Sequence, residues 1–70
     1  MRIDVVIFGK HAQRSSVDVP DGSTVETALD ALAVPAQERS FLTLDGERVR
    51  PETPLQDGGE LRVIVPLGGG

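Results

Sequence analysis

Hydrophobic and polar positions alternate over residues 2–8, where β-branched residues dominate and neither glycine nor proline occurs. This pattern is typical of a strand with one face in a core. The core face is predicted to hold Ile3, Val5 and Ile7. Val6 and Phe8 then make one end of the opposite face unusually apolar.

A second strand is predicted at residues 15–20, with Val17 and Val19 pointing inward. Residues 9–13 read as the loop of a hairpin that joins it to the first strand. The strand is expected to end at Pro20, because proline lacks the N–H that a sheet ladder needs.

An amphipathic helix is predicted after this turn. Ser23 and Glu26 have the spacing of a capping box, in which each side chain accepts a hydrogen bond from the backbone N–H of the other residue. The helix is expected to end near Ala33, since Pro35 disfavours helical geometry at the residue before it. That gives about ten residues, or ~15 Å. The apolar residues of this helix are spaced by three and four positions and therefore lie on one face. They are Val25, Ala28, Leu29, Leu32 and Ala33.

The second half of the chain reads as strands joined by turns. Residues 41–44 form a short strand, the Asp45-Gly46 dipeptide signals a hairpin, and residues 47–50 form the return strand. An irregular stretch at 51–59 follows. The last strand, 60–66, is the most apolar and is expected to lie centrally.

The order of these elements predicts an α+β domain, with a mixed sheet of four to five strands and one helix packed on one face. Seventy residues allow one domain at most, and stability is marginal at this size unless the core is well built. We expect residues 1–66 to form the domain and residues 67–70 a flexible tail.

The tail is the candidate functional segment. After Pro66 and Leu67 come three glycines, and the only chemical group there is the α-carboxylate of Gly70. This carboxylate is ionised at neutral pH and becomes an electrophile only when another enzyme activates it. The alternative is that a glycine-rich end is an incidental linker.

Composition narrows the function classes. The net charge is −4, from seven basic and eleven acidic residues, and the basic ones form no stripe, so nucleic-acid binding is not expected. An acidic surface fits a basic partner, or serves solubility alone. Cysteine is absent, which excludes disulfides and thiolate metal sites. His11 is the single histidine and has no partners near it in the sequence, so it is interpreted as a solvated loop residue.

No catalytic set, metal cluster or phosphate loop is apparent, so we expect neither an enzyme nor a bound cofactor or metal. There is no stretch of the ~20 apolar residues that a membrane span needs. The expected location is therefore the cytoplasm, and the expected state in the absence of partners is a monomer.

The chain resembles the ThiS/MoaD family of sulfur carriers, within the ubiquitin-like superfamily. The resemblance covers the whole chain and is carried by four stretches in order: Ile7-Phe8-Gly9, residues 21–32, residues 44–47 and residues 54–70. It implies a β-grasp fold, in which the first and last strands lie side by side and parallel. Family members end in two glycines, whereas this chain ends in three. Which two of the three glycines a partner enzyme recognises is left open.

The resemblance also implies a function. In such carriers a ubiquitin-activating-type enzyme uses ATP to adenylate the terminal glycine carboxylate, which is converted to a thiocarboxylate. The sulfur goes to thiamine, molybdopterin, tRNA or an amino acid, while some relatives are joined to lysines of target proteins. Here Gly70 would carry the acyl group, and Gly68 and Gly69 would form the thin tail behind it. Residues 67–70 reach ~13 Å at most, enough to enter a buried ATP site.

A docking surface must offset the entropy lost when the tail is ordered. The candidate is the sheet face away from the helix, where the expected contacts are Phe8, Phe41, Arg62 and Ile64, together with Val6 and Thr43, and with Pro66 and Leu67 at the base of the tail. The alternative for each phenylalanine is that it turns inward to fill an aromatic-poor core.

Three functions stay open at this point. The first is a sulfur carrier, and the second is a protein modifier joined to substrate lysines through Gly70. Lys10 is the only lysine, so self-linked chains would have to use it or the N-terminal amine. The third is a β-grasp interaction module whose glycine tail is incidental.

Overall fold

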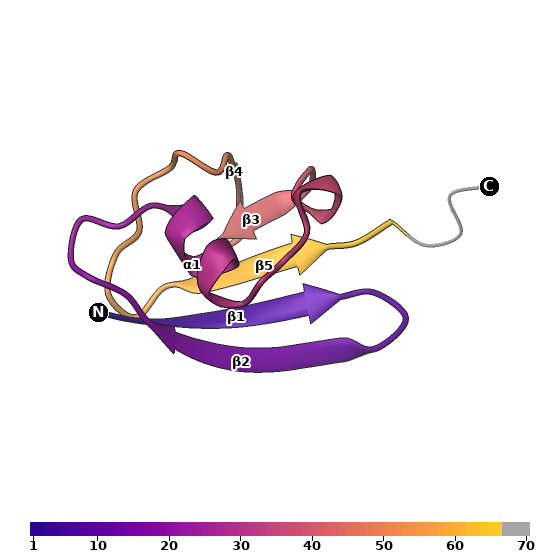
Figure 1. Cartoon of the computed structure of the whole chain (residues 1–70), viewed down its shortest axis with the longest axis horizontal. Helices are drawn as coiled ribbons and strands as arrows, with labels where there is room; N and C mark the ends of the chain where they lie inside the picture. The colour runs from indigo at the N-terminus through magenta and orange to yellow at the C-terminus, as the bar shows by residue number, and fades with distance from the viewer. Residues whose placement is uncertain (67–70) are drawn as a thin grey trace.

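The computed structural model describes residues 1–66, which fold into a five-stranded sheet crossed on one face by a single helix (Figure 1). The strands are β1 (Arg2–Phe8), β2 (Ala12–Asp18), β3 (Leu42–Leu44), β4 (Glu47–Val49) and β5 (Glu60–Ile64). The helix α1 spans Val25–Ala31, and a short 3-10 helix, η1, spans Ala36–Glu38. No helix in this part of the chain is long and apolar enough to cross a membrane.

The sheet has the strand order β2-β1-β5-β3-β4, so the last strand is central, as the sequence predicted. β1 and β5 run parallel, with Val5 opposite Leu61 and Phe8 opposite Ile64. The other strand pairs are antiparallel. This mixed sheet with one helix is the ubiquitin-like β-grasp arrangement, so the expected fold is confirmed.

The core lies between the sheet and α1. Alternation along β1 and β5 buries Ile3, Val5, Leu61 and Val63 completely, as predicted. From the helix, the buried side chains are Val25, Ala28 and Leu29. Leu55 anchors the irregular 51–59 stretch in the same cluster.

Strand β2 differs from its predicted bounds. It covers Ala12–Asp18 instead of residues 15–20, and the hairpin loop shrinks to residues 9–11. The strand ends before Val19, whose amide donates to the carbonyl of Met1 at 2.9 Å. The prediction was wrong at the start because residues 12–14 carry no apolar alternation, and cross-strand pairing with β1 alone makes them extended.

The predicted capping box does not form. Thr24 is the N-cap of α1, and no side chain caps the helix. Instead, the amides of Val25 and Glu26 donate to the carbonyls of Thr53 and Pro51, at 2.9 and 2.8 Å. These two N–H groups of the first turn are therefore satisfied by a loop that follows much later in the chain, which local sequence patterns do not reveal.

Helix α1 ends earlier than predicted, in a Schellman arrangement. Ala33 has a φ of +56°, and the amides of Ala33 and Val34 donate to the carbonyls of Asp30 and Leu29, both at 3.0 Å. This left-handed position normally takes glycine, because a Cβ is unfavourable there.

Replacing Ala33 with glycine is expected to raise the free energy of unfolding by about 0.5–1 kcal/mol, because relief of the left-handed strain exceeds the extra unfolded-state entropy. Chemical denaturation measures this difference. Ala31→Gly is the matched control: Ala31 is also exposed but is the last residue of α1 and has helical geometry, so the same change should lower the free energy of unfolding by about 0.5–1 kcal/mol. Equal effects of the two variants would contradict this account of the helix end.

Candidate functional site

The candidate site is the end of the sheet where the chain leaves β5. β1 and β5 are parallel, so their carboxyl ends meet at this end, and the β1–β2 loop lies beside them (Figure 1). The last described hydrogen bond of the chain runs from the Val65 amide to the carbonyl of Phe8, at 2.7 Å. Val65 is therefore held beside the end of β1, and Pro66 follows it.

Two phenylalanines are exposed at this end. Phe8 is 37% exposed and Phe41 is 41% exposed, and no other large hydrophobic side chain within residues 1–66 is exposed to this degree. Neither ring turns inward to fill the core, so the alternative interpretation of these residues is wrong.

An apolar row crosses the sheet on the face away from α1, and the strand register defines it. Phe8 pairs with Ala12 on one side and with Ile64 on the other, and the Ile64 amide donates to the carbonyl of Phe41 at 3.0 Å. Ile64 is half-buried, while the other members are exposed. We call this set the apolar row: Ala12, Phe8, Ile64 and Phe41.

The structure corrects one member of the predicted surface. Val6 lies on this face but is only 4% exposed, so it is not available to a partner. Its cross-strand neighbours are Arg14 and Arg62. The aliphatic stems of such long side chains commonly cover apolar neighbours in this way. Thr43, also predicted for this surface, is half-buried next to Arg62.

Two arginines lie over the exposed rings. The guanidinium carbon of Arg48 is 4.1 Å from the ring centroid of Phe41, and that of Arg62 is 5.9 Å from the centroid of Phe8. Exposed cation–π contacts of this kind contribute about 0.5–1 kcal/mol each. The sequence analysis predicted Arg62 for this surface but missed Arg48, because the pairing of β3 with β4 brings it there.

Of the other residues predicted for the site, Pro66 is exposed two positions after the end of β5. Leu67, Gly68, Gly69 and Gly70 lie outside the described residues. His11 is exposed in the β1–β2 loop, as expected for a solvated side chain.

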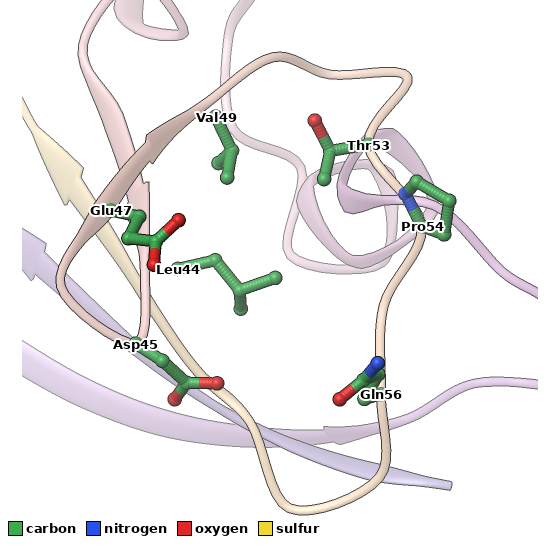
Figure 2. Close-up of a pocket in the computed structure, with 7 residues that line it drawn as sticks. All are labelled: Leu44, Asp45, Glu47, Val49, Thr53, Pro54 and Gln56. Atoms are coloured by element: carbon green, nitrogen blue, oxygen red, sulfur yellow. The ribbon is translucent and has the colours of Figure 1, made fainter.

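A shallow pocket of about 360 Å³ lies elsewhere, between the β3–β4 hairpin and the 53–56 segment (Figure 2). Leu44 and Val49 extend toward its centre, and the carboxylates of Asp45 and Glu47 lie at one side. Asp45 is also structural: its Oδ1 accepts a hydrogen bond from the Glu60 amide at 3.0 Å. Asp45 has a φ of +51° and Gly46 of +90°, as the predicted hairpin turn requires.

The model of the ThiS family matches residues 5–70 of this sequence. This chain belongs to the ThiS family. The match extends through the terminal glycines as well as the folded body. No protein with a curated description matches the chain.

Solved structures agree with the fold of this ThiS-family chain. SAMP1 from Haloferax volcanii has a TM-score of 0.83 and 22% identity over 100% of both chains. A structure of H. volcanii small archaeal modifier protein 1 has a TM-score of 0.77 and 25% identity, covering 93% of this chain and 97% of the other. A chain in the complex of subunits 1 and 2 of molybdopterin-converting factor from Helicobacter pylori 26695 has a TM-score of 0.68 and 19% identity over 100% of both chains.

Proposed function

We propose that this protein is a sulfur carrier whose Gly70 carboxylate is adenylated by a ubiquitin-activating-type enzyme and then converted to a thiocarboxylate. The observation that carries the proposal is the ThiS family match through Gly70. Small carriers of the ThiS type are generally not enzymes themselves. The carboxylate is therefore the substrate, and the partner enzyme supplies the catalytic groups and uses the ATP.

The chemistry divides into two steps. A Gly70 carboxylate oxygen attacks the α-phosphate of ATP, so pyrophosphate leaves and an acyl-adenylate forms. Hydrosulfide supplied by a sulfur donor then attacks the acyl carbon, so the new C–S bond replaces the bond to the phosphate oxygen, AMP leaves, and the terminus is a thiocarboxylate. The chain's own contribution is to offer a terminus without side chains and a body that docks.

The folded body supports the docking part of the proposal. At the end of the central strand β5, Ile64 lies between the exposed Phe8 and Phe41 in the strand register, and Val65 and Pro66 lead away from this point. A partner that receives the terminus must cover this end of the sheet. A protein of the same fold is indeed found in a two-subunit complex, that of molybdopterin-converting factor.

Intact-mass spectrometry of the protein isolated from its native cell tests the proposal. The expected result is a population with one oxygen exchanged for sulfur, on a chain that ends at Gly70. A native protein that ends elsewhere, or that never carries sulfur, would contradict the proposal.

The second candidate function is protein modification, in which the activated Gly70 carboxylate forms an isopeptide with a substrate lysine. It is favoured by the likeness to a protein described as a small archaeal modifier, at 25% identity. A remnant of the glycine tail on lysines of other proteins would identify it. Both functions use the same activated terminus, so one protein can serve both.

If modification occurs, Lys10 is expected to be the site of self-conjugation. It is the only lysine, and it is exposed in the β1–β2 loop. The amino group of Met1 is less available, because it donates to the Val19 carbonyl at 2.7 Å and lies 3.6 Å from Asp21. Lys10→Arg keeps the charge and should abolish self-conjugates while leaving conjugates on other proteins. Peptide mapping of purified conjugates measures both, and self-conjugates in this variant would refute the assignment.

A further inference from the structure

Three arginines stand in one row beside the apolar row, although the chain as a whole has a net charge of −4. The register sets them on the face away from α1, in the order Arg14, Val6, Arg62, Thr43 and Arg48 across the five strands. We call Arg14, Arg62 and Arg48 the arginine row. Lys10 adds a further exposed cation in the loop at the same end of the sheet.

Of the three arginines, Arg48 has the guanidinium group that is most available to bind a carboxylate of a partner. Its guanidinium stacks on Phe41, with 4.1 Å between the guanidinium carbon and the ring centroid. Within residues 1–66 it makes no ion pair. A stacked guanidinium keeps its N–H groups at its edge, where they can bind a carboxylate in bidentate fashion.

The other two arginines share one carboxylate. Glu60 lies 2.9 Å from an Arg62 nitrogen and 3.4 Å from an Arg14 nitrogen. Each carboxylate oxygen of Glu60 therefore receives one arginine, and neither arginine has a carboxylate of its own. The pairs are partly exposed, with 49% of the Arg62 side chain accessible, so they are worth little to stability and can be rearranged by a partner.

The remaining carboxylates of this face lie farther from the tail. Asp4 pairs in register with Glu60 and accepts from the Ser16 hydroxyl at 2.9 Å. Asp18 is at the far end, 3.2 Å from Arg2. From the tail end, the face therefore runs from apolar side chains to guanidinium groups to carboxylates.

We propose that the protein that binds this face presents carboxylates to Arg48 and Arg62 around an apolar centre that receives Phe8 and Phe41. The reason is geometric. Arg48 lies on the Phe41 ring and Arg62 lies near the Phe8 ring, so no partner can bury the rings without also desolvating the guanidinium groups. A wholly apolar or basic partner would bury Arg48 without any counter-charge and would leave Arg62 with only the carboxylate of Glu60 that it shares with Arg14, which is strongly unfavourable.

This inference rests on the proposed function for the identity of the partner, which is the activating enzyme. The net charge of −4 alone would favour a basic partner. The arginine row gives the surface next to the tail the opposite charge, so the partner at this surface is expected to be acidic. A phosphate backbone is a poorer fit than a protein surface, since Asp4 and Glu60 lie directly beside the arginine row and the whole chain is acidic.

The test compares binding of the full chain and of its Arg48→Glu variant to the purified ubiquitin-activating-type enzyme of the same cell, at low and high salt. We expect Arg48→Glu to weaken binding about tenfold or more at low salt, and to reduce the salt dependence seen with the unaltered chain. Arg2→Glu is the matched control: it makes the same charge change on the same face, at the end away from the tail, and should change the Kd by less than about threefold. Equal binding by Arg48→Glu and the unaltered chain would overturn the proposal.

Measuring binding and thiocarboxylate formation together separates this inference from the proposed function. Unaltered binding by Arg48→Glu, together with normal thiocarboxylate formation, would refute the inference and keep the function. Salt-dependent binding that needs Arg48, without any adenylation of Gly70, would refute the function and keep the inference. If bulk tRNA binds with an affinity comparable to that of the activating enzyme, the arginine row is a nucleic-acid site and the proposal is overturned. If the chain self-associates in sedimentation experiments and Arg48→Glu abolishes this, the arginine row binds a second copy and the proposal is likewise overturned.

Discussion

A chain that lacks Gly69 and Gly70 is expected to lose thiocarboxylate formation completely while its body remains folded. The deletion moves the terminal carboxylate from Gly70 to Gly68, ~7 Å nearer the folded body at ~3.3–3.6 Å per residue, where the ATP site of the partner would not reach it. The buried core of the described structure lies between Ile3 and Val63, so the fold does not depend on the deleted residues. Intact mass after incubation with the activating enzyme, ATP and a sulfur donor measures the loss.

A chain that lacks one of the three glycines, and so ends in two, is the matched control for this deletion. It shortens the tail but keeps the terminal glycine pair typical of the family, so we expect it to accept sulfur. Thermal unfolding should give the same midpoint for both deletions and for the unaltered chain. Sulfur on the chain without Gly69 and Gly70 would show that the carrier function does not require these two residues. Loss of function in both deletions would indicate that the length of the tail matters, and not the terminal pair alone.

Leu61→Ala is expected to have the largest effect on stability. Leu61 is fully buried in the central strand β5, where it is paired with Val5 of β1 and Leu44 of β3 beneath α1. Truncation of such a leucine costs about 2–5 kcal/mol, from lost transfer energy and the cavity that remains. For a domain of this size, each kcal/mol lowers the Tm by about 4–8 °C. Calorimetry should therefore show a fall in Tm of at least about 8 °C.

Leu32→Ala is the control for this substitution. Leu32 is only half-buried at the C-cap of α1, so the same change of side chain removes less buried surface and should cost less. Both variants keep the tail, so activity measured below their Tm should be retained. A larger loss from Leu32→Ala than from Leu61→Ala would contradict the description of β5 as the centre of the core.

Local sequence signals were sufficient where one residue type or one period determines the structure. Period-two alternation identified the core faces of β1 and β5, and Asp45-Gly46 identified the β3–β4 turn. The spacing of Val25, Ala28 and Leu29 identified the buried face of α1. The pairing of β1 with β5 came from the family resemblance, because side-chain periodicity carries no information on which strands are neighbours.

The α+β class, most of the core and the candidate terminus follow from the amino-acid sequence alone. The contacts between distant segments become known only from the folded chain. The loop carbonyls of Pro51 and Thr53 accept the hydrogen bonds that the expected capping box would have accepted. The burial of Val6 and the stacking of Arg48 on Phe41 follow from the strand register. This is because backbone hydrogen bonds and side-chain contacts between strands depend on the assembly of the whole sheet, and not on the residues next to them in the chain.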